Sequence, residues 1–193
     1  MFYAPATHAR RERDYYATPP ELVHALVIGL QQGGLTLPTP VHDPCAGAGK
    51  LIDTLEALGV GCFGSELYPD QYPRHRRILV KPLDAVSLDP RGMRALVTNP
   101  PYGRATEAIV AAGVRAVQKG VVALAAYLLP LPWEAAGSPS RLVLMRSMRL
   151  RIVCCWRPEW IDGTGGGGKM NYAWLVWTKP GLCLPQTVYV EKP

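Results

Sequence analysis

The chain has 193 residues, 48% of them hydrophobic, which is enough for one globular core and too few for two comfortable domains. Its longest uninterrupted apolar run, residues 121–129, falls well short of the ~20 residues of a membrane helix, and the amino terminus lacks the apolar stretch of a signal peptide. The formal net charge of +6 favours a polyanionic partner. We therefore expect a single soluble, cytoplasmic domain over residues 1–193 without membrane contact, in which residues 1–14 form a mobile basic terminus.

The first predicted elements alternate between helix and strand. "TPPELVHALVIGL" begins a helix, because Thr18 and Glu21 have the spacing of a capping box and prolines occupy the first turn. "VHDPCAGAGKLIDTLEALG" passes from a short strand through a glycine-bearing turn into a helix that ends near Gly59. "VGCFGSEL" and "RILVKPLD" indicate two further strands, each of which ends in an acid.

The second half of the chain continues this alternation. "RALVTN" is predicted as a strand, "ATEAIVAAGVRAVQ" as a helix closed by Gly120, "VVALAAYLL" as a buried strand and "PSRLVLMRSM" as a short helix. "RLRIVCCW" and "MNYAWLVW" are predicted as late strands on either side of a glycine-rich loop at residues 162–168. This order predicts an α/β fold with seven strands in a mostly parallel sheet and helices on both faces.

The five cysteines indicate reduced thiols. Their number is odd and no pair has C-x-x-C spacing, so we expect neither a disulfide framework nor a zinc site. They are instead interpreted as small residues, most of them in the core, and no metal is expected: Cys45, Cys62, Cys154, Cys155 and Cys183.

The turn in "DPCAGAG" is the first candidate ligand site, because ligands of parallel sheets gather at the carboxyl ends of the strands. Gly47 and Gly49 allow a tight turn and a close ligand approach just before a helix amino terminus, although an ordinary strand-to-helix turn is an equal alternative. A phosphate-binding loop is disfavoured, since Pro44 replaces its first glycine and Leu51 its Ser or Thr. Ile52 replaces the third glycine of a dinucleotide fingerprint.

Two acids that end predicted strands favour a cofactor with a nucleoside part. Glu66 lies about 20 residues beyond the turn, where an acid usually binds ribose hydroxyls. Asp84 ends the next strand and can accept a hydrogen bond from an adenine amino group, although capping of the following turn is nearly as good an interpretation.

The stretch "LVTNPPYG" supplies the candidate catalytic residues. An exocyclic amine of a nucleobase is a poor nucleophile until two acceptors hold its hydrogens, and the Asn99 side-chain oxygen and the Pro100 carbonyl can do so while stabilising charge on nitrogen. Pro100 and Pro101 keep the loop extended and offer no competing N–H, while Tyr102 can stack on a base. The alternative is a proline-rich loop with a surface tyrosine.

With these motifs in order, residues 15–177 resemble S-adenosylmethionine-dependent amino-methyltransferases, specifically the small adenine-N6 DNA methyltransferases of phages and mobile elements. "NPPY" is the most specific match, and "DPCAGAG" supports it. The resemblance implies a Rossmann-like class I methyltransferase fold, S-adenosylmethionine as cofactor, and Asn99, Pro100, Pro101 and Tyr102 as the catalytic motif. The cofactor-binding residues that it implies are Tyr16, Thr18, Pro19, Asp43, Pro44, Cys45, Ala46, Gly47, Gly49, Glu66, Leu67, Asp84, Ala85 and Asn99.

The late stretch "RPEWIDGTGGGGKMNYAWLVW" resembles the base-contacting motif of the same family. The resemblance implies that Trp160 packs on the target base, that Lys169 lies near a phosphate, and that Asn171 and Tyr102 contribute to substrate binding. Trp160 is equally well interpreted as a rim residue of the core, and the glycine run as a flexible connector. Several nearby arginines suit phosphate contact, although a solvated charged face explains them equally well: Arg141, Arg146, Arg149, Arg151 and Arg157.

Together these interpretations predict direct methyl transfer to the N6 amine of a DNA adenine held outside its stack. Only a short tail follows residue 177, so we expect no separate recognition domain and a short or relaxed target, unless a partner supplies specificity. The family resemblance also implies a link to restriction and modification. RNA adenine remains an alternative substrate.

Two further alternatives stay open. Protein glutamine-N5 methylation uses the same four-residue motif, but its enzymes typically carry a helical domain before the cofactor turn, and only 42 residues precede Asp43. A nucleic-acid-binding module with a decayed site is disfavoured by the intact Asp43, Glu66, Asn99 and Tyr102.

Overall fold

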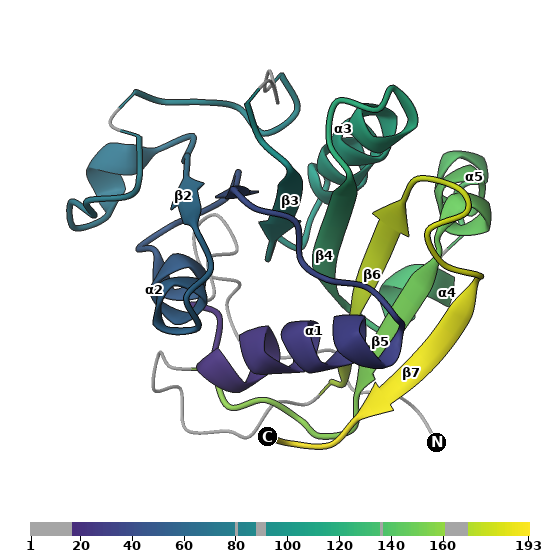
Figure 1. The fold of residues 1–193 in the computed structure, drawn as a ribbon. Coiled ribbons are helices and arrows are strands. Elements are labelled where there is room, and N and C mark those ends of the chain that lie inside the picture. The colour runs from purple at the N-terminus through teal and green to yellow at the C-terminus, as the bar shows by residue number, and fades with distance from the viewer. Residues whose placement is uncertain (1–16, 80, 88–91, 136, 161–169) are drawn as a thin grey trace, which may run out of the picture.

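The computed structural model describes residues 17–79, 81–87, 92–135, 137–160 and 170–193. The predicted mobile terminus, Tyr16, Lys169 and the glycine-rich loop at residues 162–168 lie outside the described residues. Figure 1 shows the elements, which in chain order are α1 (Pro20–Gln32), β1 (Val41–Asp43), α2 (Lys50–Ala57), β2 (Cys62–Gly64), the 3-10 turn η2 (Pro69–Gln71), β3 (Ala95–Thr98), α3 (Thr106–Gln118), β4 (Leu124–Pro130), α4 (Pro132–Ala135), α5 (Pro139–Ser147), β5 (Leu150–Cys154), β6 (Tyr172–Thr178) and β7 (Gln186–Val190).

The strands form one seven-stranded sheet in the order β2-β1-β3-β4-β6-β5-β7. Four neighbouring pairs are parallel: β1 with β2, β1 with β3, β3 with β4, and β5 with β7. β6 runs antiparallel to both of its neighbours, β4 and β5. The predicted α/β fold with a mostly parallel seven-stranded sheet is therefore confirmed.

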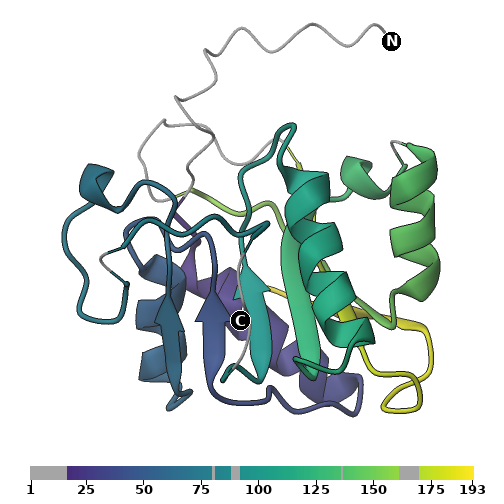
Figure 2. The ribbon, with the colours of Figure 1, turned by 90° about the horizontal axis from the view of Figure 1, so that it is seen from above.

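Helices cover both faces of this sheet (Figure 2), as predicted. α1 and α2 pack on one face, against strand residues such as Ile152 and Trp174. α3 packs on the other face against Tyr127 and Leu175, and α5 contributes partly buried residues there. Alternate residues of a strand point to opposite faces, and here both faces are covered. β6 is therefore buried along its whole length, and its sequence is almost continuously apolar.

Two contacts hold α1 closely against the sheet. The Trp174 indole Nε1 donates a hydrogen bond to the carbonyl oxygen of Leu22, in the first turn of α1, at 2.7 Å. Gly29 lies so close to Ile152 that a Cβ on the glycine would collide with the isoleucine side chain. The first turn of α1 is thereby held against β6, and a later turn against β5.

The prediction of a strand in "RILVKPLD" is wrong. The described residues of this stretch make a single parallel bridge, between Gly64 and Ile78, and no strand. β2 is only three residues long and offers few partners, Leu79 is 43% exposed, and Pro82 has no N–H to donate to a sheet. The seventh strand is instead β7, which the tail supplies and which pairs with β5.

The other predicted elements are present with shifted ends. β4 begins three residues later than expected, and α4 was not predicted. The capping box at the start of α1 is wrong, because Pro19 is the N-cap residue and no side chain caps the helix. All five cysteines are free in the structure, where Cys62 and Cys154 are buried and Cys155 is exposed.

No helix within the described ranges is long and apolar enough to cross a membrane.

Candidate active site

A cavity of about 290 Å³ lies at the carboxyl ends of β1, β2 and β3. The loops that follow these strands supply most of its wall, together with the residues just before α1. Ten of the predicted cofactor residues line the cavity: Thr18, Asp43, Pro44, Cys45, Ala46, Glu66, Leu67, Asp84, Ala85 and Asn99. Pro19, Gly47 and Gly49 do not line it.

Gly47 and Gly49 instead shape the turn after β1. Both have left-handed backbone conformations, with φ of 51° and 86°. A side chain on Gly49 would also meet the ring of His75, which lies over the turn and whose Nε2 is 2.9 Å from Asp53 Oδ1. The glycines therefore allow the tight turn that the sequence predicted.

Asp43 ends β1 as a buried carboxylate in the cavity wall. It is 2% exposed, and its Oδ1 accepts a hydrogen bond from the Cys45 backbone N–H at 3.0 Å. Burial raises the pKa of Asp43 to about 7, because the charged form loses hydration. The same burial, together with the Asp43 charge, raises the pKa of the Cys45 thiol well above its ordinary value, so Cys45 is a poor nucleophile.

Glu66 joins the loops after β1 and β2. Its Oε2 accepts a hydrogen bond from the Gly47 N–H at 2.9 Å, and its Oε1 accepts from the N–H groups of Leu67 and Tyr68 at 2.8 and 3.2 Å. A carboxylate can accept about four hydrogen bonds, so one more site remains for a hydroxyl group of a ligand. Glu66 was expected to end the strand, but it lies two residues beyond the end of β2.

Asp84 lies in the loop that replaces the predicted third strand. Its Oδ1 accepts a hydrogen bond from the Val86 N–H at 2.9 Å, which is the turn-capping contact of the alternative interpretation. Asp84 also lines the cavity, so the capping contact holds a carboxylate at the cavity wall.

Asn99 follows β3, and both ends of its side-chain amide are hydrogen-bonded. Its Nδ2 donates to Thr18 Oγ1 at 3.2 Å, and its Oδ1 accepts from the Tyr102 hydroxyl at 2.5 Å. The loop after it is held by Thr106, whose hydroxyl donates to the Pro101 carbonyl oxygen at 2.6 Å. Pro100 is buried, and Pro101 lines the cavity.

Three aromatic rings, which we call the aromatic cluster, adjoin Asn99: Tyr102, Trp160 and Tyr172. The ring centroids of Tyr102 and Trp160 are 6.5 Å apart, and Tyr172 lies 5.8 Å from Tyr102 and 5.1 Å from Trp160. Sequence reasoning missed Tyr172. Tyr172 begins a predicted strand. An antiparallel strand begins beside the carboxyl ends of its neighbours, so this position would have been a signal if the strand direction had been predicted.

Sequence reasoning also missed eight residues of the cavity wall. Lys50 and Leu51 directly follow the glycine turn, so their position was a usable signal, while no sequence pattern marks the others. The eight are Ala17, Lys50, Leu51, Tyr68, Tyr72, Val86, Ala105 and Ile109.

Two of the five arginines considered for phosphate contact are ion-paired within the structure. Arg141 lies 3.2 Å from Glu107 Oε2, with its guanidinium 4.5 Å from the centroid of the Trp133 ring. Arg151 pairs with Glu134 at 2.8 Å. These contacts favour a structural role for both arginines, and the phosphate hypothesis remains a prediction for Arg146, Arg149 and Arg157.

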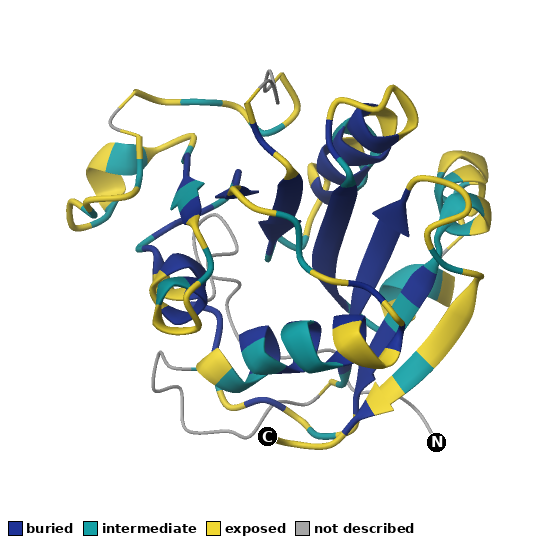
Figure 3. Ribbon diagram, viewed as in Figure 1, coloured by how far each residue is buried: buried dark blue, intermediate teal, exposed yellow. Residues whose placement is uncertain are grey.

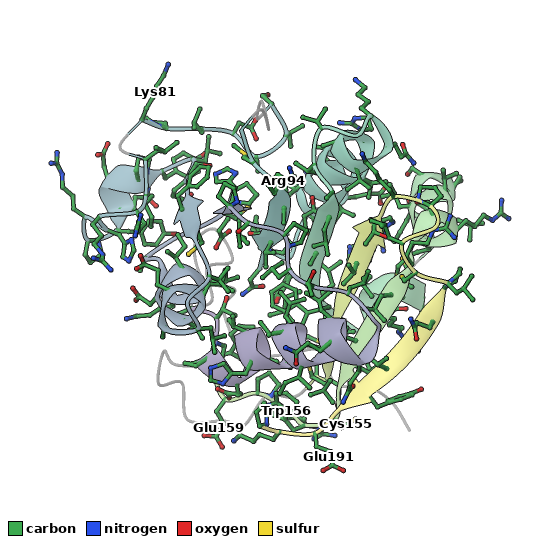
Figure 4. All side chains as sticks on the ribbon, in the orientation of Figure 1. Lys81, Arg94, Cys155, Trp156, Glu159 and Glu191 are labelled. Carbon is green, nitrogen blue, oxygen red and sulfur yellow. The ribbon has the colours of Figure 1, made fainter. Side chains whose placement is uncertain are left out.

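Acidic side chains also lie in the last third of the chain. Figure 4 shows Glu159 and Glu191 pointing away from the protein on the side of α1.

The Asn171 backbone carbonyl accepts a hydrogen bond from the Leu131 N–H at 3.0 Å, while a substrate role for its side chain stays a prediction. No group of three His, Cys, Asp or Glu side chains within the described part of the chain is placed to hold a metal ion.

No protein-family model and no curated protein matches the chain, whereas solved structures match its fold. PH1948 of Pyrococcus horikoshii, provisionally described as an RNA methyltransferase, is 13% identical with a TM-score of 0.61, over 90% of this chain and 92% of its own. The M protein of the type I restriction enzyme EcoKI is 14% identical with a TM-score of 0.58, over 94% of this chain and 49% of its own. The 23S rRNA methyltransferase ErmE is 18% identical with a TM-score of 0.55, over 89% and 72%.

These similarities define the fold. A class I S-adenosylmethionine-dependent methyltransferase of Listeria monocytogenes, also provisionally described, matches with a TM-score of 0.59 and 13% identity, over 95% of this chain and 68% of its own. The chain has the class I methyltransferase fold.

Proposed function

We propose that the protein transfers a methyl group from S-adenosylmethionine to the exocyclic N6 amine of adenine in DNA. One observation carries this proposal: Asn99 lines the cavity and is also hydrogen-bonded to Tyr102 of the aromatic cluster. A cofactor in the cavity and a planar base against the cluster would therefore meet at the Asn99 side chain.

The cavity wall suits S-adenosylmethionine, which when bound supplies an electrophilic methyl group. Glu66 retains acceptor capacity for ribose hydroxyls, and Asp84 would accept from the adenine amino group. Leu67, Val86 and Ile109 add apolar surface for a planar ring.

Asn99 and Pro100 would act on the substrate amine. The Asn99 side-chain oxygen and the Pro100 carbonyl oxygen would accept its two hydrogens and stabilise positive charge as nitrogen attacks. The Tyr102 hydroxyl donates a hydrogen bond to Asn99 Oδ1, which is the same oxygen that would accept from the substrate amine. The Tyr102 ring would stack on the base, with Trp160 beside it.

Proteins of similar fold include both an RNA-directed enzyme and a restriction-system M protein, so the fold does not distinguish DNA from RNA as the substrate. The choice of DNA therefore rests on the sequence resemblance. RNA adenine is the second candidate. The similarity to the EcoKI M protein also supports a proposal that a partner protein contributes target specificity.

The test offers the purified protein S-adenosylmethionine with a labelled methyl group and four samples: double-stranded DNA, single-stranded DNA, RNA, and a protein extract free of nucleic acid. Digestion to nucleosides is expected to yield labelled N6-methyladenine from DNA. Label in RNA alone or in protein glutamine would overturn the DNA assignment. Cofactor binding with no transfer to any sample would support a decayed site. An Asn99→Ala preparation controls for contaminating methyltransferases.

A further inference from the structure

The Asn99 side chain must present its oxygen, and not its NH2 group, to an incoming amine. Two N–H groups that face one another cannot hydrogen-bond, and rotation of the amide by half a turn exchanges its oxygen and nitrogen. Some neighbouring group must therefore select one orientation. This requirement rests on the proposed function, in which Asn99 is an acceptor for the substrate amine.

The contacts of the Asn99 amide with Thr18 and Tyr102 fit one orientation better than the other. O–H···O hydrogen bonds span about 2.5–3.0 Å and N–H···O bonds about 2.7–3.2 Å. The Tyr102 contact is 2.5 Å and the Thr18 contact is 3.2 Å, so the atom beside Tyr102 fits an oxygen and the atom beside Thr18 fits a nitrogen. A rotated amide would place a nitrogen at a distance too short for an N–H donor.

Thr18 is held in place independently of the loop that carries Asn99. It is 5% exposed and lies two residues before α1, joined to the helix by Pro19 in an extended conformation. The bond from Trp174 to Leu22 and the close contact of Gly29 with Ile152 fix α1 against the sheet. The Thr18 hydroxyl does not cap α1, so it is directed to Asn99 across 81 positions of sequence.

We infer that Thr18 is a positioning residue, whose hydroxyl oxygen accepts from Asn99 Nδ2 and so directs Asn99 Oδ1 toward the substrate amine. Thr18 also lines the cavity, so the test must separate this role from cofactor binding. Valine has nearly the shape of threonine but cannot accept a hydrogen bond, while serine keeps the hydroxyl.

The kinetic test compares Thr18→Val with Thr18→Ser under saturating cofactor and substrate. Thr18→Val is expected to lower kcat at least ten-fold and to change the cofactor Kd, measured by calorimetry, less than three-fold. Thr18→Ser is expected to recover most of the lost kcat. Thr178→Val is the matched control, because Thr178 is a buried threonine at the far end of β6 from the aromatic cluster. A kcat within two-fold of wild type in Thr18→Val would overturn the inference.

A second test needs neither turnover nor a stable valine variant. The Nδ2 protons of Asn99 are assigned by nuclear magnetic resonance from the signal lost in Asn99→Asp. One of the two protons is expected to exchange slowly with solvent in the wild type and in Thr18→Ser, and faster in Thr18→Ala. Equal exchange in the wild type and Thr18→Ala overturns the inference. If no nucleic acid or protein is methylated, the proposed function fails, and this measurement still decides the orientation.

Discussion

The two halves of the sheet differ in the length of their strands and in the candidate functional side chains that they supply. β1 and β2 have three residues each and β3 has four, whereas β4 and β6 have seven each. The carboxylates of the cavity, Asp43, Glu66 and Asp84, all belong to the short half, and β4 and β6 supply none of the lining residues. Figure 3 shows β4 and β6 as buried strands in the interior.

This difference separates stability from chemistry. The long strands bury continuous apolar side chains against helices on both faces, so each residue contributes to the core. The short strands end early, and the loops that follow them carry polar groups that can face a ligand. Substitutions in the long half should therefore act on stability, and substitutions in the short half on turnover or on pH dependence.

The largest expected effect on stability is that of Trp174→Ala in the long half. Trp174 is fully buried and anchors α1 through its indole N–H, so the substitution leaves a cavity and removes a hydrogen bond. The free energy of unfolding should fall by about 3–5 kcal/mol in urea denaturation. Trp174→Phe keeps much of the volume and should lose less than half of that amount. A change below about 1 kcal/mol for the alanine variant would contradict the assignment of stability to this half.

Asn99→Ala should have the largest effect on turnover. Loss of one acceptor of the amine should lower kcat by about 10²–10³-fold, while the melting temperature and cofactor affinity change little. Steady-state kinetics and calorimetry measure the two quantities. The matched control is Gln186→Ala, which removes a side-chain amide from β7, where it contacts the Gly33 carbonyl oxygen. Retained turnover in Asn99→Ala would disprove the two-acceptor mechanism.

Asp43 should make the protein less stable as the pH rises. Its pKa is about 7 when folded and 3.8 when unfolded, so the folded state holds the proton more tightly. The free energy of unfolding should decrease from about pH 4 to about pH 7 by on the order of 2–4 kcal/mol and then level off. Urea denaturation across this range should show a much smaller decrease in Asp43→Asn. Identical pH profiles would contradict the prediction.

His42, next to Asp43 in β1, should have the opposite dependence on pH. It is fully buried and stacked on Phe63, and burial lowers its pKa from 6.5 to about 4. The unfolded state then binds the proton more readily, so stability should fall as the pH drops from about 6.5 to about 4, by on the order of 1–3 kcal/mol. His42→Phe keeps a ring against Phe63 and should remove this part of the profile. An unchanged acid limb would show that other groups cause it.

Local sequence predicted those parts of the fold and site in which the residues themselves supply the physical reason. The glycines at 47 and 49 allow left-handed turns, and the apolar face of residues 51–55 meets the sheet, so the β1–α2 unit was predictable. The run from Leu96 to Tyr102 was predictable for the same reason, because a buried strand must end where two prolines follow.

The failures concern residues whose state depends on a distant partner. Residues 77–84 have strand-like composition, but β2 is too short to pair with them. β7 is a strand because the edge of β5 is available to it, and four of its five residues are exposed or half-buried. Thr18 has capping-box spacing, yet its hydroxyl bonds to Asn99 instead.

The sequence alone therefore determined where three candidate site residues lie, since Asp43, Glu66 and Asn99 each end or follow a strand that is recognisable from its own residues. Only the tertiary structure decided how those residues meet. The antiparallel direction of β6 brings Tyr172 to Tyr102 and Trp160, and the docking of α1 brings Thr18 to Asn99. The contacts of Tyr172 with Tyr102 and of Thr18 with Asn99 join residues 70 and 81 positions apart, and local propensity carries no information about such pairs.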